Sequence, residues 1–390
     1  MIHVLRLGVQ TIAWLVALAW VYKLLSVIRG LPLVPDLCDP QWDSLPDGMP
    51  SLTVIVPARQ EAADIGATLR SLLAQDYPNL QIIAVDDRST DETGAIIDRI
   101  AQQHPQHLRA IHVTELPAGW LGKTHAMALA ARQGESDWIL FTDADITFAP
   151  DALRRALVLA TATGADHLVA VPTMQIARWD EGMMLGFFQC IGIWIARPWH
   201  IPDPSRNDSA GAGAFNLIRR SAYQQIGGFE ALRMVVLEDI AFGRLIKSSG
   251  LKQRLAFAPG LIRVHWASGA LGLMRVMVKN LFSGFGFSVP LLLAGCVWVI
   301  VFCLFPPVGF AFPSLRLPTA ITALAVFGIY RFLGRRSLIS SGYALLFSSA
   351  AVVFVIAMLQ SMQAVRRQGG VTWRGTFYSL KDLKRFTLLP

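Results

Sequence analysis

The run Leu52-Thr-Val-Ile-Val-Pro57 decides the fold class, because it is apolar, rich in β-branched residues and stopped by a proline. Such a run predicts a short strand that is buried on both faces. Comparable runs recur at residues 81–85, 108–113 and 138–142, and segments with helical apolar spacing lie between them. Strands that alternate with helices are typical of a mostly parallel sheet flanked by helices. An α/β domain is therefore expected over residues 51–268.

Two of the intervening helices carry recognisable end signals. Ser89 and Glu92 have the spacing of a capping box at the start of one helix. Pro150 at the start and Gly164 just past the end bracket another helix. These signals support the alternation of strands and helices.

The composition points to a membrane protein that carries one globular domain. Of 390 residues, 53% are hydrophobic and only 16% charged, with a net charge of +8 and four cysteines, which argues against a disordered chain and a disulfide-framed scaffold. Residues 289–330 hold a single charge, Arg316, and residues 337–365 hold none. Runs of about 20 apolar residues are long enough to cross a hydrocarbon core.

The apolar runs and linkers divide the chain into six predicted parts. They are an N-terminal transmembrane helix at 1–28, a linker rich in Pro and Asp at 29–50, the α/β domain at 51–268, an interfacial amphipathic segment at 269–288, about three transmembrane helices at 289–363 and a basic tail at 364–390. The predicted spans are residues 7–26, 290–312, 319–333 and 338–362, with Lys23 reaching toward the headgroups. A cleaved signal peptide is the alternative for the first span. Residues 183–199 fit an interfacial helix and a core helix of the soluble domain equally well.

The distribution of arginines predicts the orientation. Arg331, Arg335 and Arg336 lie between the last two spans, which favours a cytoplasmic loop and, by counting spans backward, a cytoplasmic α/β domain. The basic tail would then lie outside, against the same rule, so one apolar segment is expected to be re-entrant or interfacial. The predicted location is the cell (inner) membrane, with several spans.

Acidic pairs follow two of the predicted strands. Asp86 and Asp87 end the second strand, and Asp143 and Asp145 come directly after the fourth. In open α/β sheets ligands bind outside the carboxyl ends of the strands. Hard carboxylate ligands suit Mg²⁺ or Mn²⁺, although an aspartate that caps a turn is an alternative. Neither a Walker sequence nor GxGxxG follows the first strand.

The order and spacing of five short motifs resemble the family-2 glycosyltransferases over residues 51–285. The motifs are Pro57-Ala-Arg-Gln-Glu61, Val85–Asp91, Gly122-Lys123, Thr142–Asp145 and Glu238-Asp239. The resemblance implies a GT-A fold, a nucleotide-sugar donor, a divalent metal (Mg²⁺ or Mn²⁺) and inversion at the anomeric carbon. The flanking spans resemble the branch that contains ceramide-glucosyltransferase-like, carotenoid and hopanoid-associated enzymes, and Val371–Gly375 resembles a tail found there.

The same resemblance implies a role for each matching residue. The nucleotide-sugar would contact Pro57, Arg59, Glu61, Asp86, Asp87, Lys123 and Asp143; the metal would contact Asp143, Asp145 and His265; the acceptor would lie near Gly211, Gly213, Arg275 and Lys279; and Asp239, beside Glu238, would be the general base. An aspartate that accepts a hydrogen bond from the base imide favours a UDP-sugar. A general base is needed because the acceptor hydroxyl must lose its proton as it attacks.

Ordinary structural roles remain open for several of these residues. Lys123 could be a solvated lysine at a helix start, and Gly211 and Gly213 an ordinary tight turn. Glu238 and Asp239 open a predicted helix, where the dipole stabilises acids. His265 could be a structural histidine.

One family motif is missing. Processive synthases and ceramide glucosyltransferases carry (Q/R)xxRW after the last strand, whereas the corresponding stretch here, Arg275–Asn280, has no tryptophan. This departure argues against a processive enzyme and leaves open which cation meets the diphosphate.

The sequence therefore predicts an inverting glycosyltransferase that moves a sugar to a membrane lipid at the cytoplasmic face of a phospholipid bilayer. The alternatives are a processive polysaccharide synthase, a polyprenyl-phosphate glycosyltransferase and a non-catalytic membrane subunit. The acidic set argues against the last of these. Nucleic acid is not an expected partner, because much of the basic excess lies beside the spans, where anionic lipid accounts for it.

Overall fold

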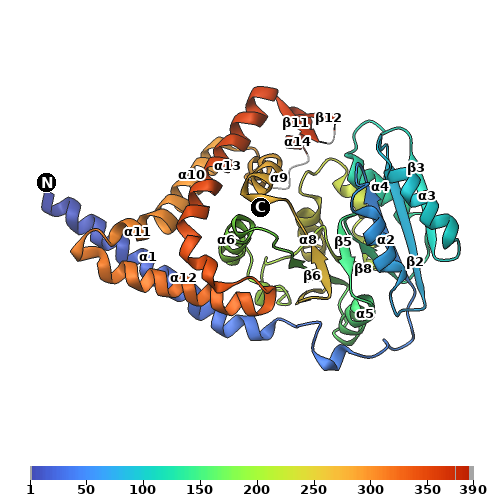
Figure 1. Ribbon diagram of the computed structural model, residues 1–390, viewed down its shortest axis with the longest axis horizontal. Coiled ribbons are helices and arrows are strands. Elements are labelled where there is room, and N and C mark those ends of the chain that lie inside the picture. Colours follow the sequence, from blue (N-terminus) through green and yellow to red (C-terminus); the bar gives the residue numbers. More distant parts are fainter. Residues whose placement is uncertain (1, 374, 386–390) are drawn as a thin grey trace. The chain divides into compact units, whose positions relative to one another are not determined.

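A computed structural model describes residues 2–373 and 375–385, and Figure 1 shows the arrangement of their helices and strands. By its contacts the chain divides into two compact units. The α/β unit comprises Val34–Gln175, Pro198–His265 and Thr372–Pro390, and the helical unit comprises Met1–Leu33, Ile176–Arg197 and Trp266–Val371.

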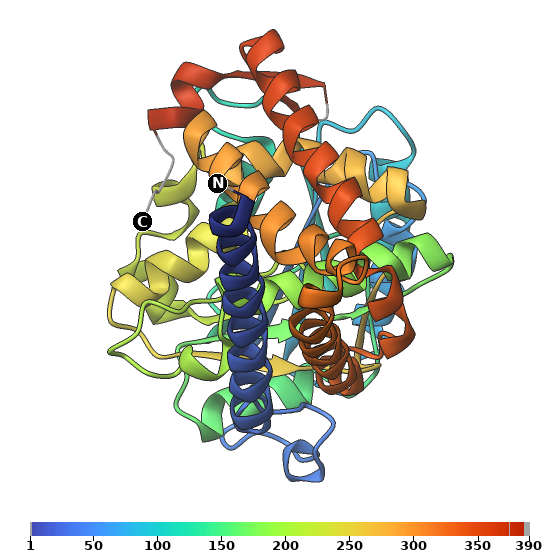
Figure 2. The same ribbon diagram turned by 90° about the vertical axis from the view of Figure 1, so that its left-hand side faces the viewer.

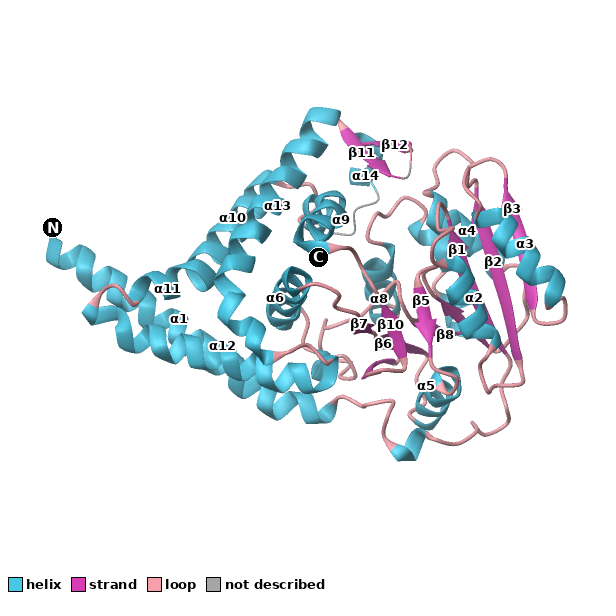
Figure 3. Cartoon of the chain, in the orientation of Figure 1, coloured by secondary structure: helices cyan, strands magenta, loops and turns pink. Residues whose placement is uncertain are grey.

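The α/β unit is built on a sheet of seven strands. Their order across the sheet is β3-β2-β1-β4-β8-β6-β9. The strands are β1 (Leu52–Ala58), β2 (Leu80–Asp87), β3 (Leu108–Val113), β4 (Trp138–Phe141), β6 (His167–Val171), β8 (Asn216–Arg219) and β9 (Gln253–Phe257). Only β8 runs antiparallel to its neighbours, so the sheet is mixed and mostly parallel, as predicted. Figure 3 shows these strands in magenta.

Both faces of this sheet are buried. Val54 and Val56 of β1 contribute to one core, and Ile55 between them contributes to the other. The first core also takes residues from α2 (Ile65–Leu73), α3 (Thr93–Gln103) and α5 (Ala152–Ala162), and the second from α4 (Gly122–Ala131), α7 (Arg220–Gln225) and α8 (Glu238–Ser248). Because side chains alternate across a strand, burial on both faces requires the continuous apolar run that the sequence shows.

A second, smaller sheet lies in the same unit. It has the order β5-β10-β7 and consists of β5 (Ile146–Phe148), β7 (Thr173–Met174) and β10 (Ile262–Val264). β10 falls in the strand-like run of residues 261–264, whereas β5 and β7, with three and two residues, are too short to show a period in the sequence. Its strand β5 begins immediately after Asp145.

The predicted capping box is wrong. α3 begins at Thr93, and Asp91 rather than Ser89 accepts a hydrogen bond from the Thr93 amide, at 3.0 Å. The Ser89 hydroxyl instead accepts from the amide of Gln60, at 3.1 Å. The α5 signals fare better: the helix begins two residues after Pro150, and Gly164 follows its end with φ +58°.

Within the described residues, the helical unit contains three helical segments that are long and apolar enough to cross a membrane: Arg6–Leu33, Pro313–Ser337 and Ser341–Gln368. They include α1 (Ile2–Gly30), α12 (Arg316–Ser337) and α13 (Phe347–Gln368), and α1 lies beside α12 (Figure 2). The run predicted at 290–312 is broken into α10 (Val289–Val299), a π-helical turn (Ile300–Leu304) and α11 (Phe305–Gly309). Pro306 and Pro307 lie in α11, where a missing amide hydrogen prevents regular helical bonding.

Two expectations about this unit are resolved by packing. Residues 183–199 fall mostly in α6 (Trp179–Ile195), which packs against α9 (Gly269–Gly284), α12 and α13. Lys23 does not reach outward, contrary to the prediction. It is buried, its Nζ donates to the Ile193 carbonyl at 3.2 Å, and it lies 4.8 Å from the centre of the Trp194 ring. The inward direction follows from the polar and aromatic partners that α6 offers to α1.

The predicted basic tail has regular structure over its described part. α13 continues to Gln368 and is followed by a two-stranded sheet of β11 (Gly370–Trp373) and β12 (Thr376–Ser379) and then by α14 (Leu380–Arg385). Of the described tail, residues 372–373 and 375–385 group with the α/β unit, whereas α6 groups with the helical unit. The bounds of the six parts predicted from the sequence stay a prediction.

Candidate active site

The carboxylate of Asp87, at the end of β2, is held by two arginines. It accepts hydrogen bonds from Nε and Nη2 of Arg88 at 2.7 and 3.0 Å, and Nη1 of Arg59 lies 3.7 Å away. Arg88 adopts φ +58°, an uncommon angle for a residue with a side chain. A two-pronged bond of this kind fixes both the position and the charge of the carboxylate.

Its neighbour Asp86 is held by different groups. It accepts from the Ser89 amide at 3.2 Å and pairs with Nδ1 of His112 at 3.3 Å, while Nε2 of His112 lies 2.8 Å from Asp98. The hydrogen bond with Asp98, together with Asp86, raises the pKa of His112 even though burial opposes it. Sequence reasoning missed His112, because a histidine inside a strand carries no motif.

Two glycines make room for this acidic pair. A Cβ atom on Gly94 would lie 2.7 Å from Oδ2 of Asp86, and one on Gly122 would lie 2.1 Å from Oδ2 of Asp87. Both distances are shorter than any van der Waals contact, so a side chain at either position would displace a carboxylate.

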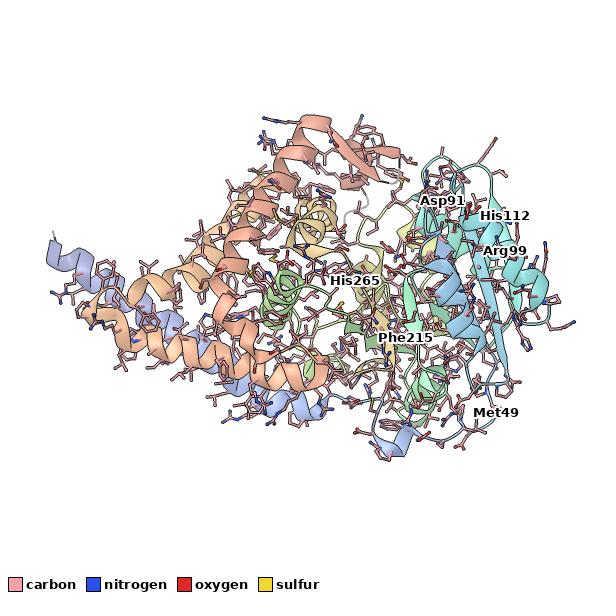
Figure 4. The ribbon with its side chains drawn as sticks, viewed as in Figure 1. Met49, Asp91, Arg99, His112, Phe215 and His265 are labelled. Carbon is pink, nitrogen blue, oxygen red and sulfur yellow. The ribbon has the colours of Figure 1, made fainter. Side chains whose placement is uncertain are left out.

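The loop after β1 is tied to the start of α3. Pro57 lies within β1, the Glu61 amide donates to Oγ1 of Thr93 at 2.8 Å, and the Ala62 amide donates to Asp91 at 3.2 Å. Figure 4 shows Asp91 and His112 at the β2–β3 side of the unit, away from His265. The predicted nucleotide-contacting residues of these loops therefore share one end of the sheet.

Lys123 joins a second group of acids. Its Nζ lies 2.6 Å from Oδ1 of Asp143 and 2.5 Å from Oε1 of Glu238. Burial alone would lower the pKa of Lys123, but the charges of Asp143, Glu238 and Asp239 raise it above its usual value. With a side chain only 21% exposed, Lys123 is not a solvated lysine at a helix start.

Two aspartates of this group ionise less readily than usual. Burial, with the charges of Asp143 and Glu61, raises the pKa of Asp145 to about 7. Burial and the charge of Glu238 raise that of Asp239 to about 6, against the opposing effect of Lys123. The negative charge gathered here exceeds what Lys123 alone balances.

The loop of Gly211 and Gly213 packs directly on Asp239. The Gly213 amide donates to Oδ2 of Asp239 at 3.1 Å, and the Ile240 amide donates to Oδ1 at 2.8 Å. A Cβ on Gly211 would lie 1.7 Å from the Asp239 carbonyl oxygen, and one on Gly213 would lie 2.4 Å from Oδ2 of Asp143. Neither glycine has a positive φ, so space rather than backbone angle requires glycine here.

Three further predicted residues lie on or next to other elements. His265 is exposed just after β10, and among the described residues no three His, Cys, Asp or Glu side chains are arranged to hold a metal ion. Arg275 and Lys279 lie on α9 in the helical unit, and the side chain of Lys279 falls outside the described ones. The roles of these three residues stay predictions.

The α/β unit thus collects carboxylates from the ends of β2 and β4 and the start of α8, together with a partly buried lysine and a loop of glycines and alanines. This set can hold a cation near an anionic ligand and places one carboxylate where it can accept a proton. It is suited to polar transfer chemistry on a charged substrate.

Comparisons with known proteins agree with this geometry. Residues 53–227 match the profile of Glycosyl transferase family 2. The 4,4'-diaponeurosporenoate glycosyltransferase of Staphylococcus aureus (strain bovine RF122 / ET3-1) is 26% identical over 343 residues, covering 85% of this chain and 88% of the relative. The protein of the same name from strain USA300 is 26% identical over 346 residues, with the same coverage of 85% and 88%.

A solved structure shares the fold. A mannosyltransferase from Pyrobaculum calidifontis, determined in complex with GDP-Man and Mn²⁺, aligns over 92% of this chain and 98% of its own with a TM-score of 0.54 and 19% identity. The fold is therefore GT-A-like, as the sequence predicted. Residues 53–227 thus carry a glycosyl transferase family 2 domain, and the chain is a nucleotide-sugar glycosyltransferase.

Proposed function

We propose that this enzyme moves one sugar from a UDP-linked donor to the hydroxyl group of a membrane lipid at the cytoplasmic face, with inversion at the anomeric carbon. The observation that carries the proposal is the meeting of Lys123, Asp143 and Asp239 around the side-chain-free loop of Gly213. It joins a group that can bind phosphate to a carboxylate that can accept a proton.

The nucleoside would bind at the ends of β1 and β2. Asp86 and Asp87 are buried and held in place there, so that an oxygen of one of them can accept a hydrogen bond from a base imide. Arg59 and Glu61 flank this position, and the pairing of Arg88 with Asp87 orients the carboxylate. Recognition by a fixed acceptor favours uracil.

A divalent metal, Mg²⁺ or Mn²⁺, would be held by Asp143 and Asp145. The fit rests on the donors themselves, because two carboxylates follow β4 and carboxylate oxygens suit such a cation; burial, with the charges of Asp143 and Glu61, also raises the pKa of Asp145 to about 7. A cation of this kind stabilises the charge that develops on a departing nucleoside diphosphate. Lys123, already paired with Asp143, would contact the diphosphate from the other side.

Asp239 would act as the general base. Its two oxygens accept the amide hydrogens of Gly213 and Ile240, which leaves each oxygen with a further lone pair. A pKa of about 6 keeps this carboxylate mostly ionised near neutral pH while leaving it basic enough to accept a proton.

The membrane lipid acceptor is supported by the three apolar helical segments and by the relatives named for 4,4'-diaponeurosporenoate. That name denotes a carboxylate, so an acceptor that is already anionic is the second candidate, and it shares with polyprenyl phosphate the property of needing no general base. A processive synthase remains less well supported, because Arg275–Asn280 lacks the tryptophan motif.

The test measures release of nucleoside diphosphate by the full chain in lipid nanodiscs, with UDP- and GDP-sugars, Mn²⁺ or Mg²⁺, and added lipid extract. Lipid-dependent release from one UDP-sugar is expected, with loss in Asp145→Ala and Asp239→Asn but not in the exposed control Glu115→Gln. Full activity of Asp239→Asn would instead support the anionic acceptor. Release from GDP-sugars alone would overturn the choice of donor.

A further inference from the structure

Three polar side chains of the large sheet are buried next to the loop of residues 210–213. His167, Asn216 and Gln253 are 0%, 3% and 1% exposed, and they belong to the adjacent strands β6, β8 and β9. Polar side chains are costly to bury unless each finds hydrogen-bond partners. Their partners therefore show what the three residues hold.

Two of the three form paired bonds with the loop backbone. The side-chain oxygen Oε1 of Gln253 accepts from the backbone amide of Ala210 at 2.7 Å, and its Nε2 donates to the Ala210 carbonyl at 3.0 Å. The side-chain nitrogen Nδ2 of Asn216 donates to the Ala212 carbonyl at 2.7 Å, and its Oδ1 accepts from the backbone amide of Ala212 at 3.4 Å. Each side chain thus bonds to both the N–H and the C=O of one alanine, in the way that a residue of a neighbouring strand pairs with the backbone.

The ring of His167 is hydrogen-bonded to both of these side chains. Its Nδ1 lies 2.9 Å from Nε2 of Gln253, and its Nε2 lies 3.2 Å from Oδ1 of Asn216. Burial lowers the pKa of His167 to about 3, so the ring is neutral. A neutral ring has one donor and one acceptor, so Nδ1 accepts from the Gln253 amide and Nε2–H donates to the Asn216 oxygen.

The two glycines that follow these alanines, Gly211 and Gly213, contact the proposed base. Gly213 donates to Oδ2 of Asp239, and the position of Gly211 is set by its close approach to the Asp239 backbone. The opposite side of the contact is equally tight, because a Cβ on Gly243 of α8 would lie 1.9 Å from the Ala210 carbonyl oxygen. A shift of the loop would therefore move the hydrogen bond to Asp239.

We propose that His167, Asn216 and Gln253 are positioning residues for transfer: they lock the loop of residues 210–213 so that Gly213 holds Asp239 in the orientation from which it accepts the acceptor's proton. The inference rests on the proposed role of Asp239. None of the three contacts substrate; they act only through the loop.

The test compares kcat and donor KM in Gln253→Met and Asn216→Leu, two changes that keep side-chain size and remove the hydrogen bonds. Gln75→Met is the matched control, because the Gln75 amide also bonds to backbone, at Ala149 and Leu153 beside α5. The variants are expected to lose about 10- to 100-fold in kcat, as misplaced catalytic groups do, with donor KM within about twofold of the original value. The control is expected to lose thermal stability but not kcat.

A double variant separates positioning from a general weakening of the fold. If the three residues act through Asp239, then Gln253→Met adds little further loss of kcat when Asp239 is already Asn. Fully multiplicative losses, or a kcat in Gln253→Met as high as in the control, would overturn the inference. If Asn216→Leu does not fold, His167→Gln replaces it in the same comparison.

The same series separates the two proposals. Loss of transfer in Asp239→Asn with full transfer in Gln253→Met and Asn216→Leu would overturn the positioning role alone. Full transfer in Asp239→Asn would overturn the proposed base, and the positioning role would fall with it.

Discussion

The ammonium group of Lys123 lies 2.6 Å from a carboxylate oxygen of Asp143, although the two residues are 20 positions apart and belong to different segments of the chain. Lys123 is the second residue of α4, and Asp143 follows β4. The same ammonium also reaches Glu238 at the start of α8. One partly buried cation thus links the starts of α4 and α8 with the segment that follows β4.

Replacing this lysine is predicted to weaken donor binding. Lys123→Met removes the only cation that pairs with Asp143 and Glu238 among the described contacts, so repulsion between acids rises and the diphosphate loses a partner. The affinity for UDP is expected to fall by about 10-fold or more, in keeping with loss of a charge-assisted bond. Calorimetric titration with UDP checks this, beside Lys252→Met on the exposed surface. Equal affinity in both variants would contradict the assignment.

The space around Gly213 gives a second prediction. Gly213→Ala places a methyl group 2.4 Å from Oδ2 of Asp143, so either this carboxylate or the loop must move. The expected result is a loss of kcat of about 100-fold, the scale for a misplaced catalytic group. Gly66→Ala is the matched control, because its Cβ would meet the flexible tip of Arg70 at 3.3 Å and make an ordinary contact with Cγ2 of Ile96 at 3.6 Å. Retained activity in Gly213→Ala would show that the loop is free to adjust.

The acids around Asp145 predict how stability changes with pH. The pKa of Asp145 is about 7 in the folded chain against 3.8 as its ordinary value, so between these values the folded state binds more protons than the unfolded state. Stability from this group is therefore highest at low pH and falls as pH rises from about 4 to 7. Melting curves of the metal-free protein should show a steeper fall across this range for the original chain than for Asp145→Asn. Identical slopes would mean that Asp145 ionises normally.

The raised pKa of Asp239 predicts the acid side of the activity profile. A base must be ionised to accept a proton, so kcat should decline below pH about 6 and approach a tenfold loss for each further pH unit. Steady-state rates between pH 4.5 and 8, in saturating donor and metal, measure this decline. A profile that is flat through pH 6 would argue for an acceptor that is already anionic.

The sequence predicted the fold wherever a local pattern reports burial. Val54, Ile55 and Val56 form an unbroken apolar run because both faces of β1 are covered, and the acids at the ends of β2 and β4 follow from the parallel topology. The capping box failed because the Ser89 hydroxyl bonds to the loop after β1, a tertiary contact that spacing alone does not report.

Side-chain partners were the least predictable part of the site. The residues of the main acidic group could be named from their motifs. The ion pairs of Lys123, and the lack of room for a side chain at Gly211 and Gly213, depend instead on segments that are distant in the sequence. His112 and His167 carry no motif, since each is defined by a partner on another element. For Lys23, composition predicted an outward direction, and the polar and aromatic groups of α6 reverse it.

The central claim is lipid glycosylation, and the fate of labelled sugar tests it most directly. Membranes that contain the full chain are supplied with radiolabelled UDP-sugar and Mn²⁺, and the lipid extract is separated by chromatography. The account predicts label in one discrete lipid band that disappears in Asp145→Ala and in Asp239→Asn. Label that stays in high-molecular-weight material, or in a band that both variants retain, would contradict it.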